Sequence, residues 1–365
     1  VIQTKEIEGT FPILPKNLTT VSFELNNADE PTIQDYTVTI APEEWEEEDI
    51  NPDAPIRVPE GYTYVSPGEN INNVFNKLKN DETVTDIKLF LKAGSTYQFV
   101  AGTLDDMPKG FSVVGQKPKE GESLAMLELK SSLSVSSVDV IEAFHFENLV
   151  IKVDALDFFK FKNQEFHIGT ISWKNCEIND LQRTMWYQEV DGDGKQTVEK
   201  VVIEDCRFFG LNSSESGFFG LSTKKNAPIH SFEFRNSTFH SNDMTKALIT
   251  GVSKMKGSLD VVVENCTFIA MKSGMTFFDL NAKNITNGSV TIKNNLFSGE
   301  TDSNSGTWFN IHAKITTRIF ENNYITNGFT FNNWGVADNE KPTETTLSMD
   351  KLFLDVTNRD FTITD

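Results

Sequence analysis

The strongest constraint on this chain is a short pattern that recurs seven times in its C-terminal two thirds, at spacings of 27 to 31 residues. Each copy joins an alternating apolar run to an Asn or Asp, with Ile or Phe three residues further on. The copies are FHFENLVI, ISWKNCEI, VVIEDCRF, FEFRNSTF, VVVENCTF, VTIKNNLF and RIFENNYI. A period of this length predicts a solenoid in which each copy contributes one coil.

The residue before the Asn or Asp fixes the register, because its charge changes sign at every copy. The seven residues are Glu147, Lys174, Glu204, Arg235, Glu264, Lys293 and Glu321. In a parallel stack, equivalent residues lie about 4.8 Å apart as lateral neighbours, where opposite charges attract and like charges repel. The alternation therefore predicts that successive coils pair in parallel.

The Asn column predicts a tight corner in each coil. Its members are Asn148, Asn175, Asp205, Asn236, Asn265, Asn294 and Asn322. Asn tolerates left-handed backbone angles, and its amide can bond to the Asn of the next coil. We expect Asp205 to weaken this ladder, because it departs from the pattern.

Three cysteines directly follow the column at Cys176, Cys206 and Cys266. An odd number makes a disulfide framework unfavourable, and the shared position predicts small thiols stacked in the interior. A bond between Cys176 and Cys206 on adjacent coils stays open.

The N-terminal part differs from the repeats. Residues 1–60 combine strand-like alternation with the acidic run EEWEEED and a proline-rich stretch, which indicates a short β-rich segment and a linker. Residues 61–365 form the predicted solenoid domain. In the segment ENINNVFNKLKND, Ile71, Val74, Phe75 and Leu78 fall on one helical face, so we expect a short helix to cap the first coil. The tail LFLDVTNRDFTITD is the expected closing coil.

Composition excludes some partners. A formal net charge of -20 and a pI near 4.7 argue against nucleic acid and against anionic membrane surfaces. No apolar run reaches the 18 to 20 residues of a membrane span. The chain starts at Val1 without a signal peptide, so we expect a mature or trimmed chain that lacks any signal or lipoprotein anchor.

Several segments resemble the right-handed parallel β-helices of the pectate-lyase-like superfamily. They are VSPGENINNVFNKL, IKLFLKAGSTYQF and FSVVGQ near the start, the NCxF and NNxF coils, and MDKLFLDVTNRDFTI near the end, so that the resemblance covers roughly residues 61–365. More narrowly, the chain is similar to uncharacterised β-helical surface lipoproteins of glycan-foraging gut bacteria. The resemblance implies an all-β solenoid with a capping helix, a monomer with a polysaccharide partner, and an extracellular or outer-surface location. It leaves the chemistry open, because the superfamily includes lyases, hydrolases, esterases and binding proteins.

Ligands of that superfamily usually lie along the outer face of one strand in each coil. On the corresponding strands of this chain, Lys224, Lys254, Lys283 and Lys314 recur at spacings of 30, 29 and 31 residues. Stacked like charges cost roughly 0.2 to 1 kcal/mol per pair unless a partner intervenes, and a uronic-acid chain would be such a partner. The alternative is four solvated lysines, each near a loop carboxylate.

A polar patch is expected beside these lysines. It comprises Asp279, Asn281, Asn310 and His312, bordered by Lys283 and Lys314. Trp308 either stacks on a sugar ring from the outer face or packs inward beside Phe309. These residues and the four lysines are the predicted ligand-binding surface.

Three functions remain open at this stage. The first is an exported protein that binds an acidic or plant-type polysaccharide. The second is a polysaccharide lyase in which Lys254 or Lys283 is the base, assisted by His312 and Asp279, since a lyase needs a base and a cation to stabilise the enolate. The third is a structural or adhesive surface module. A glycosidase is less favoured, because Asp279 has no evident carboxylate partner on an adjacent coil.

No cofactor is expected. Glu189, Asp191, Asp193 and Gly194 resemble the start of a calcium loop, but Lys200 stands where the bidentate Glu belongs. The stretch is more simply a turn, and calcium remains the alternative.

Overall fold

The computed structural model divides the chain into two units, Val1–Arg57 and Val58–Asp365. In the first unit it describes only the backbone of β1 (Thr19–Phe23) and β2 (Tyr36–Ile40), which pair antiparallel, and residues 56 and 57. In the second unit it describes residues 58–364 apart from 101, 103, 105, 136–139, 163–164, 189–194, 212–216, 221–228, 242–247, 251–255, 273–275, 282–283 and 301–305. No helix in these described segments is long and apolar enough to cross a membrane.

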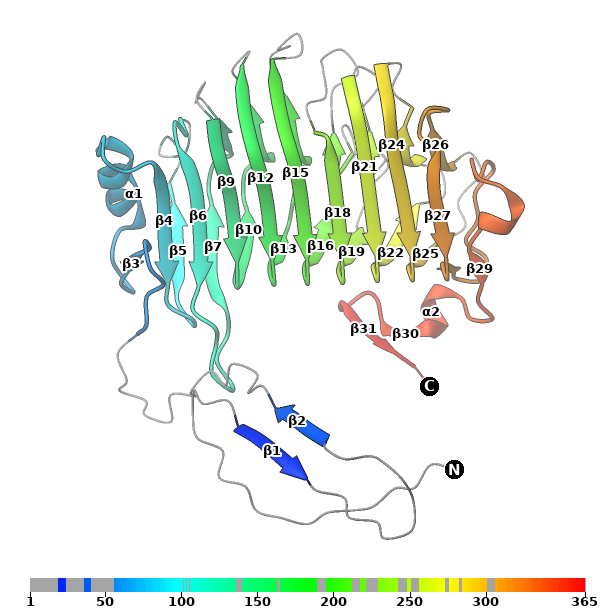
Figure 1. Ribbon diagram of the computed structural model, residues 1–365, viewed down its shortest axis with the longest axis horizontal. Coiled ribbons are helices and arrows are strands. Elements are labelled where there is room, and N and C mark those ends of the chain that lie inside the picture. The colour runs from blue at the N-terminus through cyan, green and yellow to red at the C-terminus, as the bar shows by residue number, and fades with distance from the viewer. Residues whose placement is uncertain are drawn as a thin grey trace. The chain divides into compact units, whose positions relative to one another are not determined.

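Three parallel faces build the second unit (Figure 1), and the coils in the middle of the stack contribute one strand to each face, whereas coils at both ends lack a strand on the third face. The first sheet contains β3 (Thr63–Val65), β4 (Asp86–Leu91), β6 (Gly110–Gly115), β9 (Val140–Glu147), β12 (Phe166–Lys174), β15 (Gln196–Glu204), β18 (Ser231–Arg235), β21 (Lys256–Glu264), β24 (Asn284–Lys293) and β27 (Thr317–Glu321). The second sheet contains β5 (Thr96–Phe99), β7 (Ala125–Leu129), β10 (Leu149–Val153), β13 (Glu177–Asn179), β16 (Arg207–Leu211), β19 (Thr238–Ser241), β22 (Thr267–Lys272), β25 (Leu296–Glu300), β28 (Tyr324–Ile325) and β29 (Thr343–Glu344).

The third face consists of two shorter sheets. The first has β8 (Leu133–Val135), β11 (Asp157–Phe161) and β14 (Thr184–Gln188), and the second has β17 (Phe219–Gly220), β20 (Ile249–Thr250), β23 (Thr276–Leu280) and β26 (Thr307–Ile311). The two join where the Met185 N–H donates to the Phe218 carbonyl over 2.8 Å. The predicted fold class, an all-β right-handed parallel β-helix, is confirmed.

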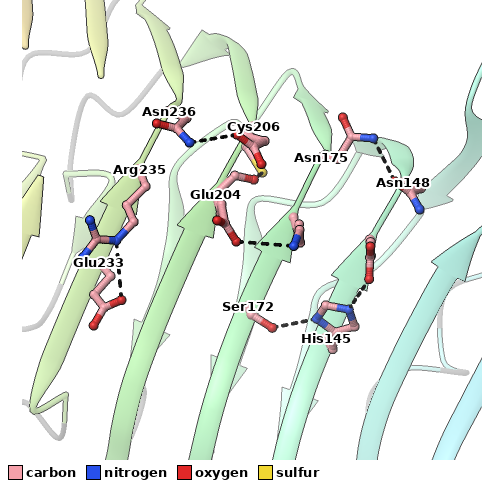
Figure 2. Close-up of polar contacts among 12 residues, drawn as sticks. His145, Asn148, Ser172, Asn175, Glu204, Cys206, Glu233, Arg235 and Asn236 are labelled. Carbon is pink, nitrogen blue, oxygen red and sulfur yellow. Dashed lines mark hydrogen bonds and ion pairs between the residues drawn. The ribbon is translucent and has the colours of Figure 1, made fainter. Parts of the chain in front are cut away.

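The alternating charge column lies in register on the first sheet, as predicted. Each member pairs laterally with the next, from Glu147 beside Lys174 to Lys293 beside Glu321. Ion pairs join Lys174 to Glu204 at 3.7 Å, Lys293 to Glu321 at 2.9 Å, and Arg235 to Glu264. Figure 2 shows Glu204 and Arg235 on neighbouring strands of this column. The charges therefore neutralise one another along the stack.

The Asn column forms the corner between the first and second sheets. All seven members have a positive φ, between 47° and 56°, which Asn and Asp tolerate better than most residues. Every Asn of the column after Asn148 donates to the preceding member, for example Asn175 to Asn148 over 2.8 Å (Figure 2) and Asn236 to Asp205 over 3.1 Å. Among the described residues no such bond joins Asp205 to Asn175, because an ionised carboxylate has no hydrogen to donate.

The interior is filled by stacked side chains of equivalent positions. The rings of Phe208, Phe239, Phe268 and Phe297 lie 5.0 to 5.1 Å apart, with interplanar angles of 5° to 10°. The three cysteines are buried and unbonded, as the shared position predicted. Burial raises the pKa of Cys266 to about 12, so this thiol is unreactive at neutral pH.

The N-terminal end is closed by α1 (Ile71–Asn80), which confirms the capping helix. The Asn70 side chain accepts from the Asn72 N–H over 2.9 Å and caps the helix. Phe75 is fully buried, with its ring 5.5 Å from both Phe99 and Phe111.

The C-terminal tail differs from the expected closing coil. It forms α2 (Met349–Leu352) and an antiparallel pair, β30 (Phe353–Asp355) and β31 (Asp360–Ile363), that folds back over the second sheet (Figure 1). The Phe361 ring lies 5.8 Å from Phe209 and 5.1 Å from His240, and Arg359 approaches Asp180 to 3.7 Å. The closing-coil prediction was wrong, because the apolar residues of the tail pack on the outside of coils rather than extending the stack.

Candidate functional site

The candidate site lies on the outer side of the third face, at β23 and β26. Phe278 and Phe309 pair across these strands and point into the core, where their rings stack at 4.5 Å and 9°. Successive side chains of a strand point to opposite sides, so the next pair, Asp279 and Asn310, points outward. The core packing of the phenylalanines thus positions the polar side chains.

A hydrogen-bonded row joins three of the predicted residues. The Asn310 amide donates to an Asp279 oxygen over 2.8 Å, and the Asn281 amide donates to the Asn310 oxygen over 3.3 Å. Asn281 and Asn310 are exposed, and Asp279 is half-buried. Counting bonds to described residues, each amide keeps one N–H and at least one acceptor lone pair for a ligand.

The electrostatics of this row centre on Asp279. Partial burial raises the pKa of Asp279, and hydrogen bonds from the Asn310 side chain and the Asn281 backbone oppose that shift. A carboxyl group with a raised pKa is more readily protonated, so it repels an anionic ligand less and can exchange a proton with one.

His312 and Lys314 lie at the C-terminal end of β26. The His312 Nδ1 accepts from the Lys314 backbone N–H over 3.3 Å, and the His312 carbonyl accepts from the Ile315 N–H over 3.0 Å. This turn leaves Lys314 exposed and His312 half-buried. Five predicted residues are therefore found on one surface: Asp279, Asn281, Asn310, His312 and Lys314.

Trp308 corrects one of the predictions. Its side chain is 0% exposed and packs against Phe297, Phe309, Phe320 and Trp334, with ring centroids 4.8 to 5.8 Å away. The proposal that Trp308 stacks on a sugar ring was wrong. Trp308 and Phe309 of β26 are both buried, as are Phe277 and Phe278 of β23, so strict alternation of inward and outward side chains does not hold for these residues.

Lys224, Lys254 and Lys283 lie outside the described residues, as does the acidic stretch from Glu189 to Gly194. The lysine column and the calcium alternative therefore stay predictions. Within the described part of the chain, no group of three potential metal ligands is found.

The sequence reasoning missed residues at the other end of the same face. Lys160 pairs laterally with Tyr187, and both occupy the position that follows an inward-facing residue, Phe159 or Trp186. The Arg183 guanidinium lies 4.0 Å from the centre of the Tyr187 ring. The repeat aligns Trp186 with Phe309. The residues that follow them, Tyr187 and Asn310, therefore share the next column, and this signal could have identified Tyr187 as an outward-facing residue.

Arg183 is held by a buried carboxylate. Its Nε donates to Asp157 over 2.7 Å, and Asp157 is 0% exposed. This pairing orients the guanidinium over Tyr187, so that an aromatic ring and a cation are fixed on the outer face. Tyr187, Arg183 and Lys160 extend the candidate surface across β11 and β14.

A second polar arrangement lies on the first sheet (Figure 2). His145 Nδ1 lies 2.7 Å from the Ser172 hydroxyl, and His145 Nε2 lies 3.0 Å from Glu147. Serine, histidine and carboxylate thus follow the order of a nucleophilic triad, but acyl transfer also needs donors aimed at an oxyanion. Both β9 and β12 pair with strands on each side, which occupies their backbone N–H groups. We therefore assign these side chains to the polar ladder of the sheet.

Comparisons with known proteins add one likeness in fold. No family model matches the chain, and no curated protein matches it. Among solved structures, the chain is similar to a PL6 family alginate lyase, AlyGC, with a TM-score of 0.39 and 12% sequence identity. The match covers 79% of this chain and 39% of that chain, so the matched part spans well under half the length of that protein. Alginate lyase activity is a property of that protein.

Proposed function

We propose that this chain is an exported protein that binds an acidic polysaccharide along the outer side of the third face. The observation that carries the proposal is the hydrogen-bonded row from Asn281 through Asn310 to Asp279 on exposed strands. Amides of this kind, with one donor and one acceptor still unused, suit the hydroxyl groups of a sugar chain. Successive coils repeat about every 4.8 Å, so an extended polymer would meet equivalent groups from coil to coil.

Charge and aromatic groups support an acidic glycan in particular. Lys314 is exposed beside the row, and the same sequence column predicts three further lysines. Arg183 and Tyr187 supply a cation and an aromatic ring further along the same face. Because the whole chain carries a formal charge of -20, this local cationic character is an exception that favours a local anionic ligand.

The location belongs to the same proposal. Intact polysaccharides are met outside the cell, so a chain that binds them would be exported. We include in this proposal a relationship to β-helical surface lipoproteins of glycan-foraging bacteria, because such proteins would meet polysaccharides at the cell surface.

The binding test compares variants on affinity gels that contain polygalacturonate, alginate or neutral polysaccharides. Lys314→Ala and Asn310→Ala are each expected to weaken retention by uronate polymers by about threefold to tenfold, as the loss of one polar contact would. Lys351→Ala removes an equal charge from an exposed position in α2 and is the matched control. Equal retention of Lys314→Ala, Asn310→Ala and the control would reject the proposed surface. Lys254→Ala and Lys283→Ala test the predicted column in the same way.

The raised pKa of Asp279 favours a second candidate, a polysaccharide lyase. In β-elimination a base removes the proton next to the uronate carboxyl group, the bond to the leaving sugar breaks, and that sugar's oxygen takes up a proton. In this scheme Lys254 or Lys283 would be the base, Asp279 would exchange a proton with the reacting groups, and His312 would assist. Incubation with uronate polymers should then produce unsaturated ends that absorb in the ultraviolet, and Asp279→Asn should abolish the signal. No absorbance with any uronate polymer rejects the lyase and leaves the binding protein.

A further inference from the structure

A groove of about 710 Å³ lies outside the second sheet, under the C-terminal segment formed by α2, β30 and β31. Its floor comes from two columns of adjacent coils at the C-terminal end of the solenoid. The floor residues are Asn265, Asn294, Asn322, Thr267, Leu296 and Tyr324. In Figure 1 the orange and red C-terminal elements lie beside β22 and β25. This groove belongs to a different sheet from the site proposed above.

The wall of the groove is apolar and is held in place from both ends. Leu352 and Ile363 face the floor, and Ile363 is 60% exposed. The Thr345 N–H donates to the Ile325 carbonyl over 2.8 Å, which ties the segment to β28. At the far end, Phe361 packs on Phe209, as described above. The groove is therefore a built feature of the coil stack and its returning tail.

Among the described residues that line the groove, none carries a charge at neutral pH. They are Asn, Thr, Leu, Ile and Tyr, although the chain as a whole has 86 residues that are Lys, Arg, Asp or Glu. The charged column of the first sheet lies one residue before the Asn corner and is paired within itself. An ionic ligand would find no oppositely charged partner among the described lining residues, whereas a neutral ligand needs none.

The floor offers repeated amide groups beside an aromatic ring. Asn294 donates to Asn265 over 3.1 Å, and Asn322 donates to Asn294 over 3.3 Å, so each of these amides spends one N–H on the ladder and keeps the second. The Tyr324 side chain is 47% exposed. Regularly spaced donors and acceptors beside an exposed ring suit a molecule with hydroxyl groups on its rim and C–H groups on its faces.

An extended peptide fits this floor poorly. Peptides that bind to sheets usually add a strand at an unpaired edge. Here β22 and β25 pair with neighbours on both sides, so the groove presents a sheet face and no free edge. We propose that the groove binds a neutral oligosaccharide, at a site independent of the acidic-glycan surface. Its volume lies within the range of roughly 300 to 1,000 Å³ typical of ligand sites.

The test is isothermal titration of the whole chain with a panel of neutral glycans, including oligosaccharides of xyloglucan, mixed-linkage β-glucan, arabinan and galactomannan. At least one is expected to bind with a Kd below about 1 mM. Tyr324→Ala should weaken that binding by about tenfold, as the loss of an aromatic anchor would. Thr267→Trp, which fills the floor, should abolish it. Leu354→Ala truncates an equally exposed apolar residue that does not line the groove, and it should bind as the parent does.

Two results would overturn the inference. One is the absence of binding by every neutral glycan of the panel at millimolar concentration. The other is equal binding by the parent, Tyr324→Ala and Thr267→Trp, with unchanged melting temperatures showing that all three are folded. Retention on polygalacturonate is measured in parallel, because Tyr324→Ala should leave it unchanged. A failure of the groove is thereby distinguished from a failure of the acidic-glycan surface.

Discussion

The break in the asparagine ladder at Asp205 leads to a prediction of increased stability. Every described junction of the ladder that has an Asn on the donating side carries a side-chain hydrogen bond to the preceding coil, whereas Asp205 has no hydrogen to offer Asn175. Asp205→Asn would supply the missing donor and would still accept from Asn236. The positive φ of 54° at this corner suits Asn as well as Asp.

The expected gain follows from the worth of one hydrogen bond. A net intramolecular hydrogen bond contributes about 0.5 to 1.5 kcal/mol, and the exposure of this corner favours the lower half of that range. Asn236 would at the same time exchange a carboxylate acceptor for a weaker amide acceptor. We therefore expect about 0.5 to 1 kcal/mol. With an unfolding entropy of about 2.1 cal/mol/K per residue over roughly 300 residues, this corresponds to a rise in Tm of about 1 to 1.5 °C.

Differential scanning calorimetry of the parent and its variants measures this shift. The matched reverse variant is Asn265→Asp, which removes an existing bond to Asn236 of 3.0 Å and should lower Tm by a similar amount. Glu120→Gln removes one negative charge from an exposed loop and controls for the change in net charge. A lower Tm for Asp205→Asn, or an unchanged Tm for Asn265→Asp, would show that the side-chain ladder does not contribute to stability.

Three further predictions concern charge. Lys293→Glu places a Glu between Glu264 and Glu321, so two attractions are lost and two repulsions are gained. At about 0.2 to 1 kcal/mol for each of these four changes, the free energy of unfolding in low salt should fall by about 1 to 3 kcal/mol. High salt screens the charges and should reduce the difference in stability between the variant and the parent. The pKa of Glu147 is lowered, chiefly by the hydrogen bond from the neighbouring His145. Its carboxylate therefore stabilises the fold at neutral pH, and the difference in urea midpoint between the parent and Glu147→Gln should vanish as the pH falls below the ordinary value of 4.5. The pKa of Asp279 is raised by burial, so its ionised form destabilises the fold at neutral pH and protonation relieves this. Asp279→Asn should therefore raise Tm at neutral pH but not in acid, as measured by calorimetry at both pH values.

The repeat made the fold predictable to the level of lateral residue pairs. In a solenoid, residues about 30 positions apart in the sequence become lateral neighbours. The charge of Lys174, opposite to the charges of Glu147 and Glu204, therefore indicates which residues pair, and a single strand considered alone could not indicate this. The same logic predicts Asp279 beside Asn310, and the two residues are lateral partners on β23 and β26. Registers of this kind can be read from the sequence because each coil repeats the same turn at the same corner.

Two features were not predictable in the same way. Trp308 is buried next to the equally buried Phe309, so a rule of strict inward and outward alternation along the strand does not assign its direction. The returning tail was missed because LFLDVTNRDFTITD is as apolar as a coil, and its antiparallel pairing follows from contacts of Phe361 with two distant coils. The groove depends on that tail, so no pattern within the repeats could have indicated it.

The three faces of the solenoid differ in how fully their polar groups satisfy one another, and this difference indicates where ligands bind. On the first sheet the column of alternating charges is paired by ion pairs and retains little to offer a ligand. The third face carries a row of amides ending in a carboxyl group whose burial is only partly compensated, beside an exposed Lys314. Beside the second sheet, the part of the corner ladder formed by Asn265, Asn294 and Asn322 is uncharged, and each of its amides uses one of two N–H donors on the ladder. Since unsatisfied groups are the ones that gain most from a ligand, we expect an acidic chain on the third face and a neutral one on the second, with the first sheet serving mainly to hold the coils in register.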